Sequence, residues 1–375
     1  MKTTRRVFLG QMGSLAVGLS LFPLAGCERN AFEPVIEGTD VPFLTPNDDF
    51  FLQFGAEGSV AGWEGVPALT GEGWSLSVEG LVERSLRVRP ADLQAEIPVS
   101  VLSTLRCVIN SNSVPGLIGT AVWTGVPLRL FLERAGIDRQ RTRRLRIFGA
   151  DGFTNNLPMH KVFADGSDGL PEPLLVYEMN GLPLAPGHGA PVRLLVPGHY
   201  GYKSVKWITR IEATEDDAVF GSYQTVLGYA DDGTVQVTNG VTSVLRGARI
   251  PPGPTRITGY ALSGGAAIER VEVAVDDADF APARLLSLRE IAALDPGIQG
   301  ATQVLDGVPY PFRGVWAPWT YRWEAAPGEH RLRVRAADVA GNVQHSTDTD
   351  PADGENAIFE VRVTVSEPEP EPAEQ

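Results

Sequence analysis

The strongest constraint on the fold is a repeated alternation of apolar and polar residues in the second half of the chain. It occurs in five segments, at residues 255–264, 268–275, 319–323, 330–336 and 357–365. A period of two places the apolar side chains on one face, which is typical of a half-buried β-strand. Several short strands separated by turns, with little helical periodicity, are typical of a β-sandwich. We therefore predict an immunoglobulin-like β-sandwich over residues 236–366, with a short helical insertion at 287–294.

The first half of the chain mixes strand and helix patterns. Strand-like segments that end in turns or loops lie at residues 74–82, 145–152 and 193–197. Residues 128–136 have the spacing of a short amphipathic helix with Gly136 as its stop. We predict a mixed domain over residues 46–235, so the fold class of the whole chain is α+β.

The first residues of the chain predict export. Arg5 and Arg6 form a twin-arginine pair, residues 12–24 are apolar, and Leu-Ala-Gly precedes Cys27. This order is typical of a bacterial export signal. We predict a twin-arginine lipoprotein signal over residues 1–26 and a lipid on Cys27, which places the protein in the periplasm or at the cell surface. An uncleaved membrane-anchoring helix is the alternative. Because this export route carries folded proteins, often with a cofactor inserted, it favours a redox cofactor.

Two segments without periodicity complete the predicted organisation. Residues 27–45 contain several prolines and are expected to form a tether. Residues 367–375 are acidic and proline-rich, so no packed structure is expected there. The formal net charge of −14 argues against a nucleic-acid partner, which would call for a basic face.

Cys107 is the thiol that remains if Cys27 carries a lipid, because the chain has only two cysteines. An intramolecular disulfide is then impossible. The remaining possibilities are a buried inert thiol, a nucleophile beside a histidine, a soft-metal ligand and an intermolecular disulfide. Arg106 and the Asn-Ser-Asn-Ser run at 110–113 are costly to bury without partners. They favour a loop that places a thiolate beside a polar site.

The sequence contains no familiar metal site made of protein ligands alone. It has no CxxC or HExxH motif, and its five histidines show no ligand spacing. It also has no c-type haem motif, no iron–sulfur cysteine set and no phosphate-binding glycine loop. A nucleophilic pair of Cys107 with His160 or His188 stays open. If Cys107 instead binds a metal, a cofactor has to supply most of the other ligands.

Several blocks resemble the sulfite-oxidase-type molybdenum enzymes. In the first half they are TLRCVIN at 104–110, AVWTGVPL at 121–128, GADGFT at 149–154, VYEMNGLPL at 176–184, HGAPVR at 188–193 and SVKW at 204–207. In the second half they are GYALSG at 259–264, IERVEV at 268–273 and RAADVAGNVQ at 335–344. The blocks keep the family's order over roughly residues 45–365. The resemblance implies a molybdopterin-binding oxidoreductase domain followed by a dimerisation domain.

The resemblance also implies residue roles. Cys107 matches the cysteine that ligates molybdenum, which is otherwise held by one pyranopterin dithiolene and by oxo or hydroxo groups. Tyr229 matches an active-site tyrosine near the metal oxygen. The residues placed at the pterin are His188, Arg193, Ser204 and Lys206, with Asp151 in a block that borders the pocket. Arginine and lysine suit a phosphate group. Without the resemblance, the sequence alone would favour other interpretations. His188 would be a turn residue, Arg193 and Lys206 would be exposed charges on strands, and Tyr229 would be an aromatic side chain packed in the core.

One departure from the family concerns the substrate. Residues 45–54 stand where sulfite-oxidising members carry an Arg-Asn-His run, and here the end of the segment reads Gln53-Phe54. An arginine facing the metal would give a dianionic oxyanion a charge-assisted anchor. Arg106 is therefore assigned to the catalytic site as a partial replacement.

These observations predict an exported enzyme. We expect a molybdopterin-dependent oxidoreductase that transfers an oxygen atom to or from a sulfite-like oxyanion or a sulfoxide in a two-electron reaction. No haem or flavin is expected, so an external carrier such as a cytochrome would exchange the electrons. The dimerisation-type domain allows a homodimer. The alternative is a lipid-anchored binding or structural protein that keeps the fold without catalysis.

Overall fold

The computed structural model describes only part of the chain. The described residues are 42–52, 67–69, 71–111, 114–163, 170–244, 247–300, 309–348 and 350–367. The predicted signal, the lipidation site Cys27, most of the tether, Gln53 and most of the acidic tail lie outside them, so these predictions stay predictions. Within these ranges, no helix is both long and apolar enough to cross a membrane.

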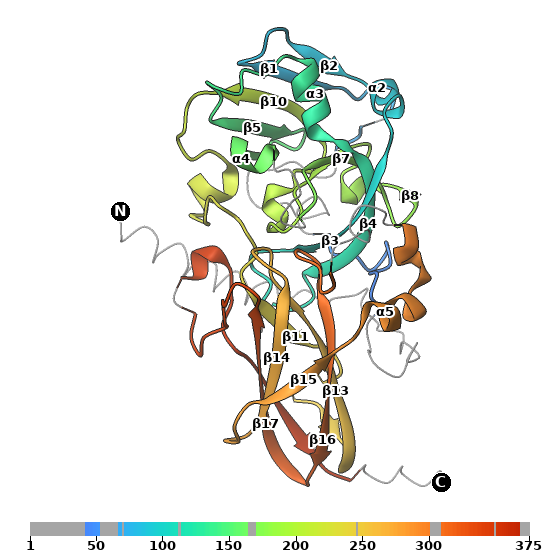
Figure 1. The fold of residues 1–375 in the computed structure, drawn as a ribbon, viewed down its shortest axis with the longest axis vertical. Coiled ribbons are helices and arrows are strands. Elements are labelled where there is room, and N and C mark those ends of the chain that lie inside the picture. Colours follow the sequence, from blue (N-terminus) through green and yellow to red (C-terminus); the bar gives the residue numbers. More distant parts are fainter. Residues whose placement is uncertain are drawn as a thin grey trace, which may run out of the picture.

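Two five-stranded sheets form the first half of the molecule, which occupies the upper part of Figure 1. The first has the order β2-β1-β10-β5-β6, and β1 and β10 pair in parallel. Its strands are β1 (Leu76–Gly80), β2 (Leu86–Val88), β5 (Arg144–Gly149), β6 (Thr154–Pro158) and β10 (Ile208–Thr214). The strands predicted near residues 74–82 and 145–152 are confirmed by β1 and β5.

The second sheet carries the segment around Cys107. Its order is β3-β4-β7-β8, with β9 paired to β7. Its strands are β3 (Val99–Arg106), β4 (Ile118–Pro127), β7 (Leu174–Met179), β8 (Leu182–Pro183) and β9 (Arg193–Leu195). The helices of this half are α2 (Pro90–Gln94), α3 (Leu128–Arg134) and α4 (Met159–Val162). The helix predicted over residues 128–136 is confirmed by α3, which ends slightly earlier, at Arg134, and buries its apolar side through Leu128, Phe131 and Leu132.

The second half is an eight-stranded sheet, drawn in the lower part of Figure 1. Its order is β11-β13-β16-β15-β14-β17-β18-β12. The strands are β11 (Thr238–Val241), β12 (Arg249–Ile250), β13 (Gly253–Leu262), β14 (Ile268–Val275), β15 (Ala281–Leu285), β16 (Ala317–Ala325), β17 (Gly328–Asp338) and β18 (Phe359–Val365). All five strands predicted from the alternation are present. The predicted insertion is α5 (Leu288–Leu294), which Ser287 and Glu290 begin with a reciprocal capping box.

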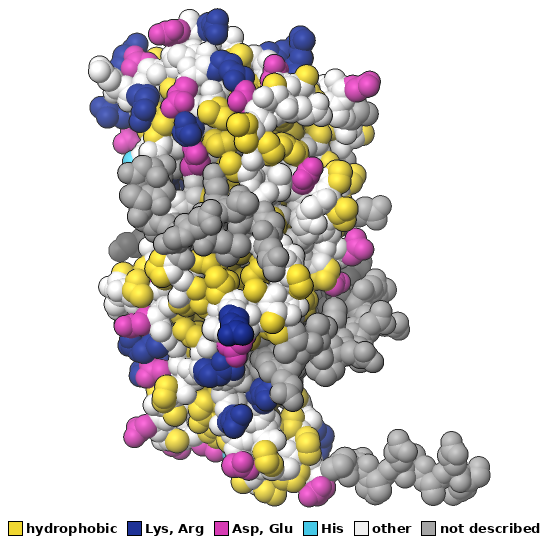
Figure 2. All heavy atoms as spheres, turned by 45° about the vertical axis from the view of Figure 1, so that its right-hand side comes forward, with side chains coloured by type: hydrophobic (Ala, Val, Ile, Leu, Met, Phe, Trp, Pro, Cys, Tyr) yellow, Lys and Arg dark blue, Asp and Glu magenta, His cyan; other side chains and the backbone are white. Residues whose placement is uncertain are grey.

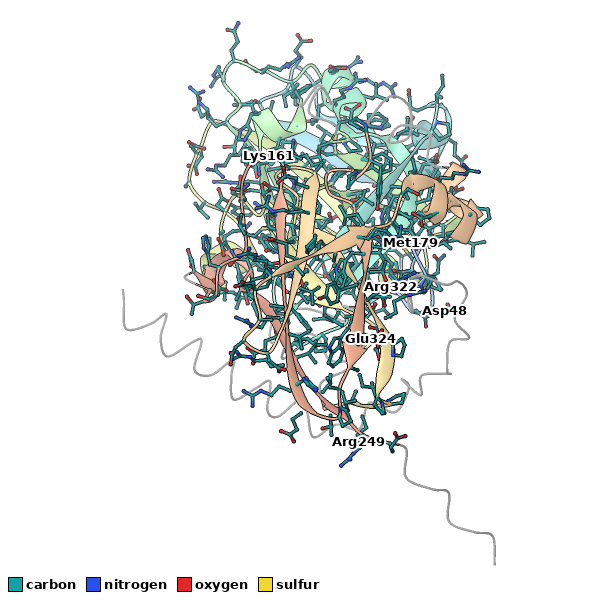
Figure 3. All side chains as sticks on the ribbon, turned by 60° about the horizontal axis from the view of Figure 1, so that its bottom comes forward. Asp48, Lys161, Met179, Arg249, Arg322 and Glu324 are labelled. Atoms are coloured by element: carbon teal, nitrogen blue, oxygen red, sulfur yellow. The ribbon has the colours of Figure 1, made fainter. Side chains whose placement is uncertain are left out.

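Alternation along these strands separates core from surface. In β16, Tyr321 and Trp323 pack on a hydrophobic core, whereas Arg322 and Glu324 are exposed (Figure 3). That core takes members from β13 and β16 and also from β14, β17 and β18, and β15 pairs with both β14 and β16. The eight strands therefore enclose their own core. The immunoglobulin-like type of this arrangement stays a prediction.

A larger core joins the two halves. It contains members of both five-stranded sheets together with Phe312 and Trp316, which precede β16. The backbone N–H of Trp316 donates to Thr104 Oγ1 of β3 over 2.9 Å, and the indole N–H donates to the carbonyl of Phe43 over 3.0 Å. The strand that leads to Cys107 is thus anchored by the second half of the chain.

The described surface mixes charges of both signs. On the face drawn in Figure 2, lysines and arginines are interspersed with acids at the two ends, and hydrophobic side chains gather toward the middle. This face presents no single basic area of the kind that binds a nucleic-acid backbone.

A pH-dependent stability is expected from the loop between β17 and β18. Burial, together with the charges of Asp350 and Asp348, raises the pKa of Asp353 to about 6. Because this folded-state pKa lies above that of an unfolded aspartate, the bound proton stabilises the folded chain at low pH. This contribution is lost as the pH rises through about 6.

Asp353→Asn stays neutral at every pH. We expect its melting temperature to exceed that of the wild type by about 1–3 °C at about pH 8 and to match it near about pH 4. Thermal unfolding at both pH values checks this, with the exposed Asp279→Asn as control. Equal offsets at the two pH values would contradict the assignment.

Candidate functional site

One pocket brings together residues from six separate sequence blocks. All six predicted cofactor residues line it, namely Cys107, Asp151, His188, Arg193, Ser204 and Lys206. Much of the remaining wall is aromatic, from Phe50, Phe51, Phe153, Tyr202 and Tyr223. Polar side chains that are scattered over the sequence therefore converge on a largely apolar cavity, as in a site for a small molecule or cofactor.

Cys107 directly follows β3 and begins a tight turn. Its N–H donates to the carbonyl of Leu117 over 2.9 Å, and its carbonyl accepts from the N–H of Asn110 over 3.0 Å. Burial raises the pKa of the thiol to about 11, although N–H groups of Ile109 and Val108 and the charge of Arg106 act in the opposite direction. The thiol alone is therefore protonated at neutral pH, and a bound metal would stabilise the thiolate.

Arg193, in β9, is a buried cation. Its Nη1 donates to the carbonyl of His188 and its Nη2 to the carbonyl of Ser204, each over 3.1 Å. The buried Nε has no hydrogen-bond partner, and no ion pair joins Arg193 to a carboxylate within the described ranges. Burial lowers the pKa of the guanidinium to about 9. A buried cation with donor capacity to spare is suited to an anionic ligand.

Lys206 and Asp151 extend the polar side of the pocket. Lys206 Nζ donates to the carbonyl of Gly187 over 2.9 Å and lies 4.7 Å from the ring centre of Trp207. Burial, and then repulsion from Arg193, lowers the pKa of Lys206 to about 7. Burial raises the pKa of Asp151, whose Oδ1 accepts from a backbone N–H. Two cationic side chains and one carboxyl thus share this side, which favours negative charge.

His188 ends the short 3₁₀ helix Pro186–His188 and is held as a neutral ring. Burial lowers its pKa, and its Nε2 lies 3.0 Å from the carbonyl oxygen of Asn47. A carbonyl only accepts hydrogen bonds, so Nε2 carries the proton and Nδ1 is left as an acceptor. Ser204 Oγ accepts a hydrogen bond from the N–H of Val196 over 3.0 Å. This bond connects the end of the short helix η2 (Gly201–Lys203) to the residue that follows β9.

Gly189 is the residue that lets the two cations converge. Its φ is +105°, and an added Cβ would lie 3.0 Å from the Cβ atoms of both Arg193 and Lys206. Gly189→Ala is expected to destabilise the chain by about 1–3 kcal/mol and to separate the two side chains. Gly181→Ala is the control, because Gly181 has φ +74° with no atom within 4 Å of an added Cβ. Thermal unfolding checks this. Equal melting temperatures for the two variants would show that the contacts at Gly189 are easily relieved.

Two predicted catalytic residues do not line the pocket. The guanidinium of Arg106 is fully buried, with Nη1 on Tyr200 Oη at 3.0 Å and Nη2 on the carbonyls of Asn110 and Glu355, each at 2.7 Å. It is therefore turned to these acceptors instead of forming pocket wall. The physical reason is that a buried guanidinium takes the acceptors within reach, which the flanking sequence does not reveal.

Tyr229 lies behind another tyrosine that the sequence analysis did not select. Tyr223, from the short π-helical turn Ser222–Val226, lines the pocket, and its ring centre is 5.6 Å from that of Tyr229. Burial raises the pKa of Tyr223 well above its ordinary value, so its hydroxyl stays protonated. Both tyrosines lie in residues 221–229, the segment in which the resemblance places an active-site tyrosine. Only the packing shows which of them reaches the cavity.

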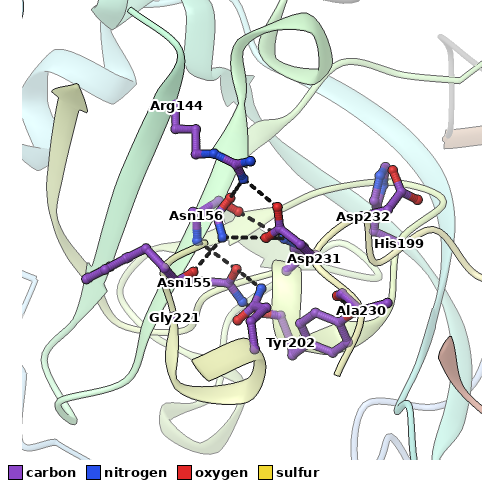
Figure 4. A network of polar contacts seen from close by, with 12 residues as sticks. Arg144, Asn155, Asn156, His199, Tyr202, Gly221, Ala230, Asp231 and Asp232 are labelled. Carbon is purple, nitrogen blue, oxygen red and sulfur yellow. Dashed lines mark hydrogen bonds and ion pairs between the residues drawn. The ribbon is translucent and has the colours of Figure 1, made fainter. Parts of the chain in front are cut away.

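A buried polar network supports this aromatic wall. Figure 4 shows Arg144, Asn156 and Asp231 pointing toward one another. Asn156 Nδ2 donates to Asp231 Oδ1 over 2.8 Å, and Arg144 Nη1 donates to Asn156 Oδ1 over 2.9 Å. Tyr202 Oη donates to the carbonyl of Ala230 over 2.7 Å. The network fixes the segment that follows Tyr229 and thereby the tyrosines behind the pocket.

Comparison with known proteins gives consistent matches. Residues 63–220 match the family described as oxidoreductase molybdopterin binding domain. Sulfite oxidase of Gallus gallus is 32% identical over 282 residues, covering 65% of this chain and 59% of that protein. Nitrate reductase [NADH] 2 of Nicotiana tabacum is 35% identical over 175 residues, covering 41% of this chain and 19% of that protein. The chain thus spans less than two thirds of these relatives.

A solved structure supports the fold. The sulfane dehydrogenase SoxCD from Paracoccus pantotrophus superposes with a TM-score of 0.69 at 23% identity, covering 90% of this chain and 86% of that one. The match extends over both halves of the chain and supports the sulfite-oxidase-like fold that the resemblance implied. The described residues form mostly strands with few and short helices, so the predicted α+β class is met only in part.

Proposed function

Since the chain belongs to the sulfite-oxidase-type molybdopterin oxidoreductase family, we propose that its pocket binds molybdenum and one pyranopterin, with Cys107 as the protein ligand of the metal. The observation that carries this proposal is the convergence of all six predicted cofactor residues on one cavity. The residues fit the group. A thiolate suits a high-valent metal, and the buried donors of Arg193 and Lys206 suit a phosphate.

Each residue would have a distinct task. Arg193 and Lys206 would neutralise the pterin phosphate, and the protonated Nε2 of His188 would stay on its carbonyl so that Nδ1 accepts from the ligand. Phe50 and Phe153 would exclude water from the pocket. Tyr223, protonated and part of the wall, would donate a hydrogen bond near the metal oxygen, the role that the resemblance implied for Tyr229.

The bound molybdenum would supply two-electron oxygen-atom transfer between water and a small substrate. Cys107 would hold the metal throughout, and the aromatic wall would admit a substrate of limited size. We propose that the electrons are exchanged with a separate carrier such as a cytochrome, because the sequence lacks haem and flavin motifs. We propose a sulfite-like oxyanion or a sulfoxide as the substrate.

The remaining parts of the proposal rest on the sequence. We propose export by the twin-arginine route, a lipid on Cys27, a cofactor domain over residues 46–235 and an immunoglobulin-like dimerisation domain over 236–366. Mass spectrometry of the membrane fraction tests the lipid, and light scattering tests the dimer.

The function is tested by turnover of the molybdenum-loaded full chain. Sulfite is offered with ferricyanide as electron acceptor, and a dialkyl sulfoxide is offered with reduced methyl viologen as donor. Turnover of either supports oxygen-atom transfer and names the direction. A loaded protein that responds to neither in stopped-flow spectra would rule out both assignments and favour the non-catalytic alternative.

A further inference from the structure

The loop between β17 and β18 of the second half reaches the segments that carry the site. The carbonyl of Glu355 accepts from Arg106 Nη2 over 2.7 Å, although the two residues are 249 positions apart. The carbonyl of Ala352 accepts from the N–H of Ala230 over 2.9 Å. The loop therefore binds the residue before Cys107 and the residue after Tyr229.

The same loop packs directly on a buried tyrosine. Gly354 has φ +84°, and an added Cβ would lie 2.4 Å from Tyr200 Oη and 2.7 Å from Tyr200 Cζ. Tyr200 is completely buried, and its ring is stacked on that of Tyr202 with centres 6.1 Å apart. Tyr202 is stacked in turn on Tyr223 at 5.3 Å, and both of these line the pocket. A continuous row of contacts therefore leads from Gly354 through Tyr200 to the pocket wall.

Arg106 connects the loop to the turn that holds Cys107. Its Nη2 binds the carbonyls of Asn110 and Glu355 together, and its Nη1 binds Tyr200 Oη. The guanidinium carbon lies 5.4 Å from the ring centre of Tyr200. Because the N–H of Asn110 closes the turn on the carbonyl of Cys107, the side chain of Arg106 joins the two ends of that turn.

We propose that Arg106 is a positioning residue, and that residues 352–355 of the β17–β18 loop hold it so that the turn fixes the direction of Cys107 Sγ. The second half of the chain thereby helps to build the metal site of the first. The proposal rests on the proposed role of Cys107 as the molybdenum ligand. It replaces the substrate-binding role that the sequence suggested for Arg106.

A pair of glycine variants isolates the contact. Gly354→Ala introduces both an unfavourable φ and a clash with Tyr200. Gly341→Ala introduces the same φ penalty, at +87°, with no atom within 4 Å of the new Cβ, at the beginning of the same β17–β18 loop. Both variants therefore carry the energetic cost of a non-glycine residue at positive φ. Only Gly354→Ala also displaces Tyr200 and, through it, Arg106.

The readout is the rate at which iodoacetamide alkylates Cys107 in the cofactor-free full chain, followed by mass spectrometry of the peptide that contains it. This peptide is distinct from the one that contains Cys27. We expect alkylation in Gly354→Ala to be at least about fivefold faster than in the wild type, because loosening the turn by about 1 kcal/mol exposes the thiol. Gly341→Ala is expected to keep the wild-type rate. Equal rates in the two variants would overturn the proposal.

A second series keeps the proposal testable if Gly354→Ala does not fold. Arg106→Lys can satisfy part of the acceptor set, whereas Arg106→Gln loses the charge and the fork. We expect the alkylation rate to rise from the wild type to Arg106→Lys and to be highest in Arg106→Gln. We also expect a shifted sulfur-to-molybdenum charge-transfer band in molybdenum-loaded Arg106→Lys. An unshifted band together with unchanged alkylation would refute the positioning role.

These outcomes are separate from those that test the proposed function. Alkylation needs no cofactor, so coupling between the loop and Cys107 is measured even if the wild type binds no molybdenum. In that case the proposed function fails while the alkylation series still decides the coupling. Conversely, a fully loaded wild type with equal alkylation in all variants removes the positioning role alone.

Discussion

Cys107→Ser is expected to lower oxygen-atom transfer activity by more than about a hundredfold. Losing a residue that only supports a metal ligand costs up to about a hundredfold, and losing the ligand itself should cost more. A serine oxygen donates less electron density to molybdenum than a thiolate and changes the reduction potential of the site. Cys107 is buried at the end of β3, and serine is of similar size. The fold is therefore expected to survive the substitution.

The measurement is turnover per folded chain, together with the charge-transfer spectrum. Ser103→Ala is the matched control. Ser103 lies in β3, the strand that leads to Cys107, is also buried, and its Oγ has no hydrogen-bond partner among the described residues. The control should keep both activity and spectrum. Full activity in Cys107→Ser would show that the thiol is not a ligand and would restore the interpretation of an inert buried cysteine.

Arg193→Gln is expected to reduce pterin and molybdenum content by about a hundredfold or more, since hydrogen bonds to a charged group contribute about 1.5–3 kcal/mol each. The guanidinium has its Nε and its charge left for a ligand, and burial already lowers its pKa to about 9. Removing a buried charge also removes a desolvation cost. The cofactor-free variant should therefore melt close to the wild type.

Metal analysis, pterin fluorescence and thermal unfolding together check this result. Arg362→Gln is the control, because the side chain of Arg362 in β18 is 78% exposed and stands in the second half of the chain. A normal cofactor content in Arg193→Gln would contradict the phosphate-binding role. A large drop in melting temperature with normal loading would make Arg193 a structural residue.

The fold was predictable where the pattern is local. Alternation within 268–275 or 357–365 is enough to predict a strand, because a half-buried strand needs a period of two. The pairing partners were not predictable in the same way. β1 pairs in parallel with β10 after more than a hundred intervening residues, and no local pattern encodes that choice. The core that joins the two halves through Trp316 was not predictable for the same reason, because it depends on contacts between distant segments.

The site was predictable through its sequence blocks but not through its orientations. Cys107 and Arg193 occupy one pocket, as the resemblance implied. Arg106 is adjacent to Cys107 in the sequence, yet its side chain is directed by Glu355, 249 positions away. Tyr223 and Tyr229 share one segment and both stack on Tyr202, with ring centres 5.3 Å and 6.3 Å away, yet of the two it is Tyr223 that lines the cavity. Side-chain direction depends on distant partners, which the neighbouring residues do not specify.

The most direct test of the central claim is the molybdenum and pterin content of the wild-type chain, produced with residues 1–26 in place in a host that loads molybdoenzymes. The account predicts near-stoichiometric molybdenum and pterin in the folded protein. Folded protein that carries neither, from a host shown to load another molybdoenzyme at the same time, would contradict it. The pocket around Cys107 would then be a binding cavity for some other ligand.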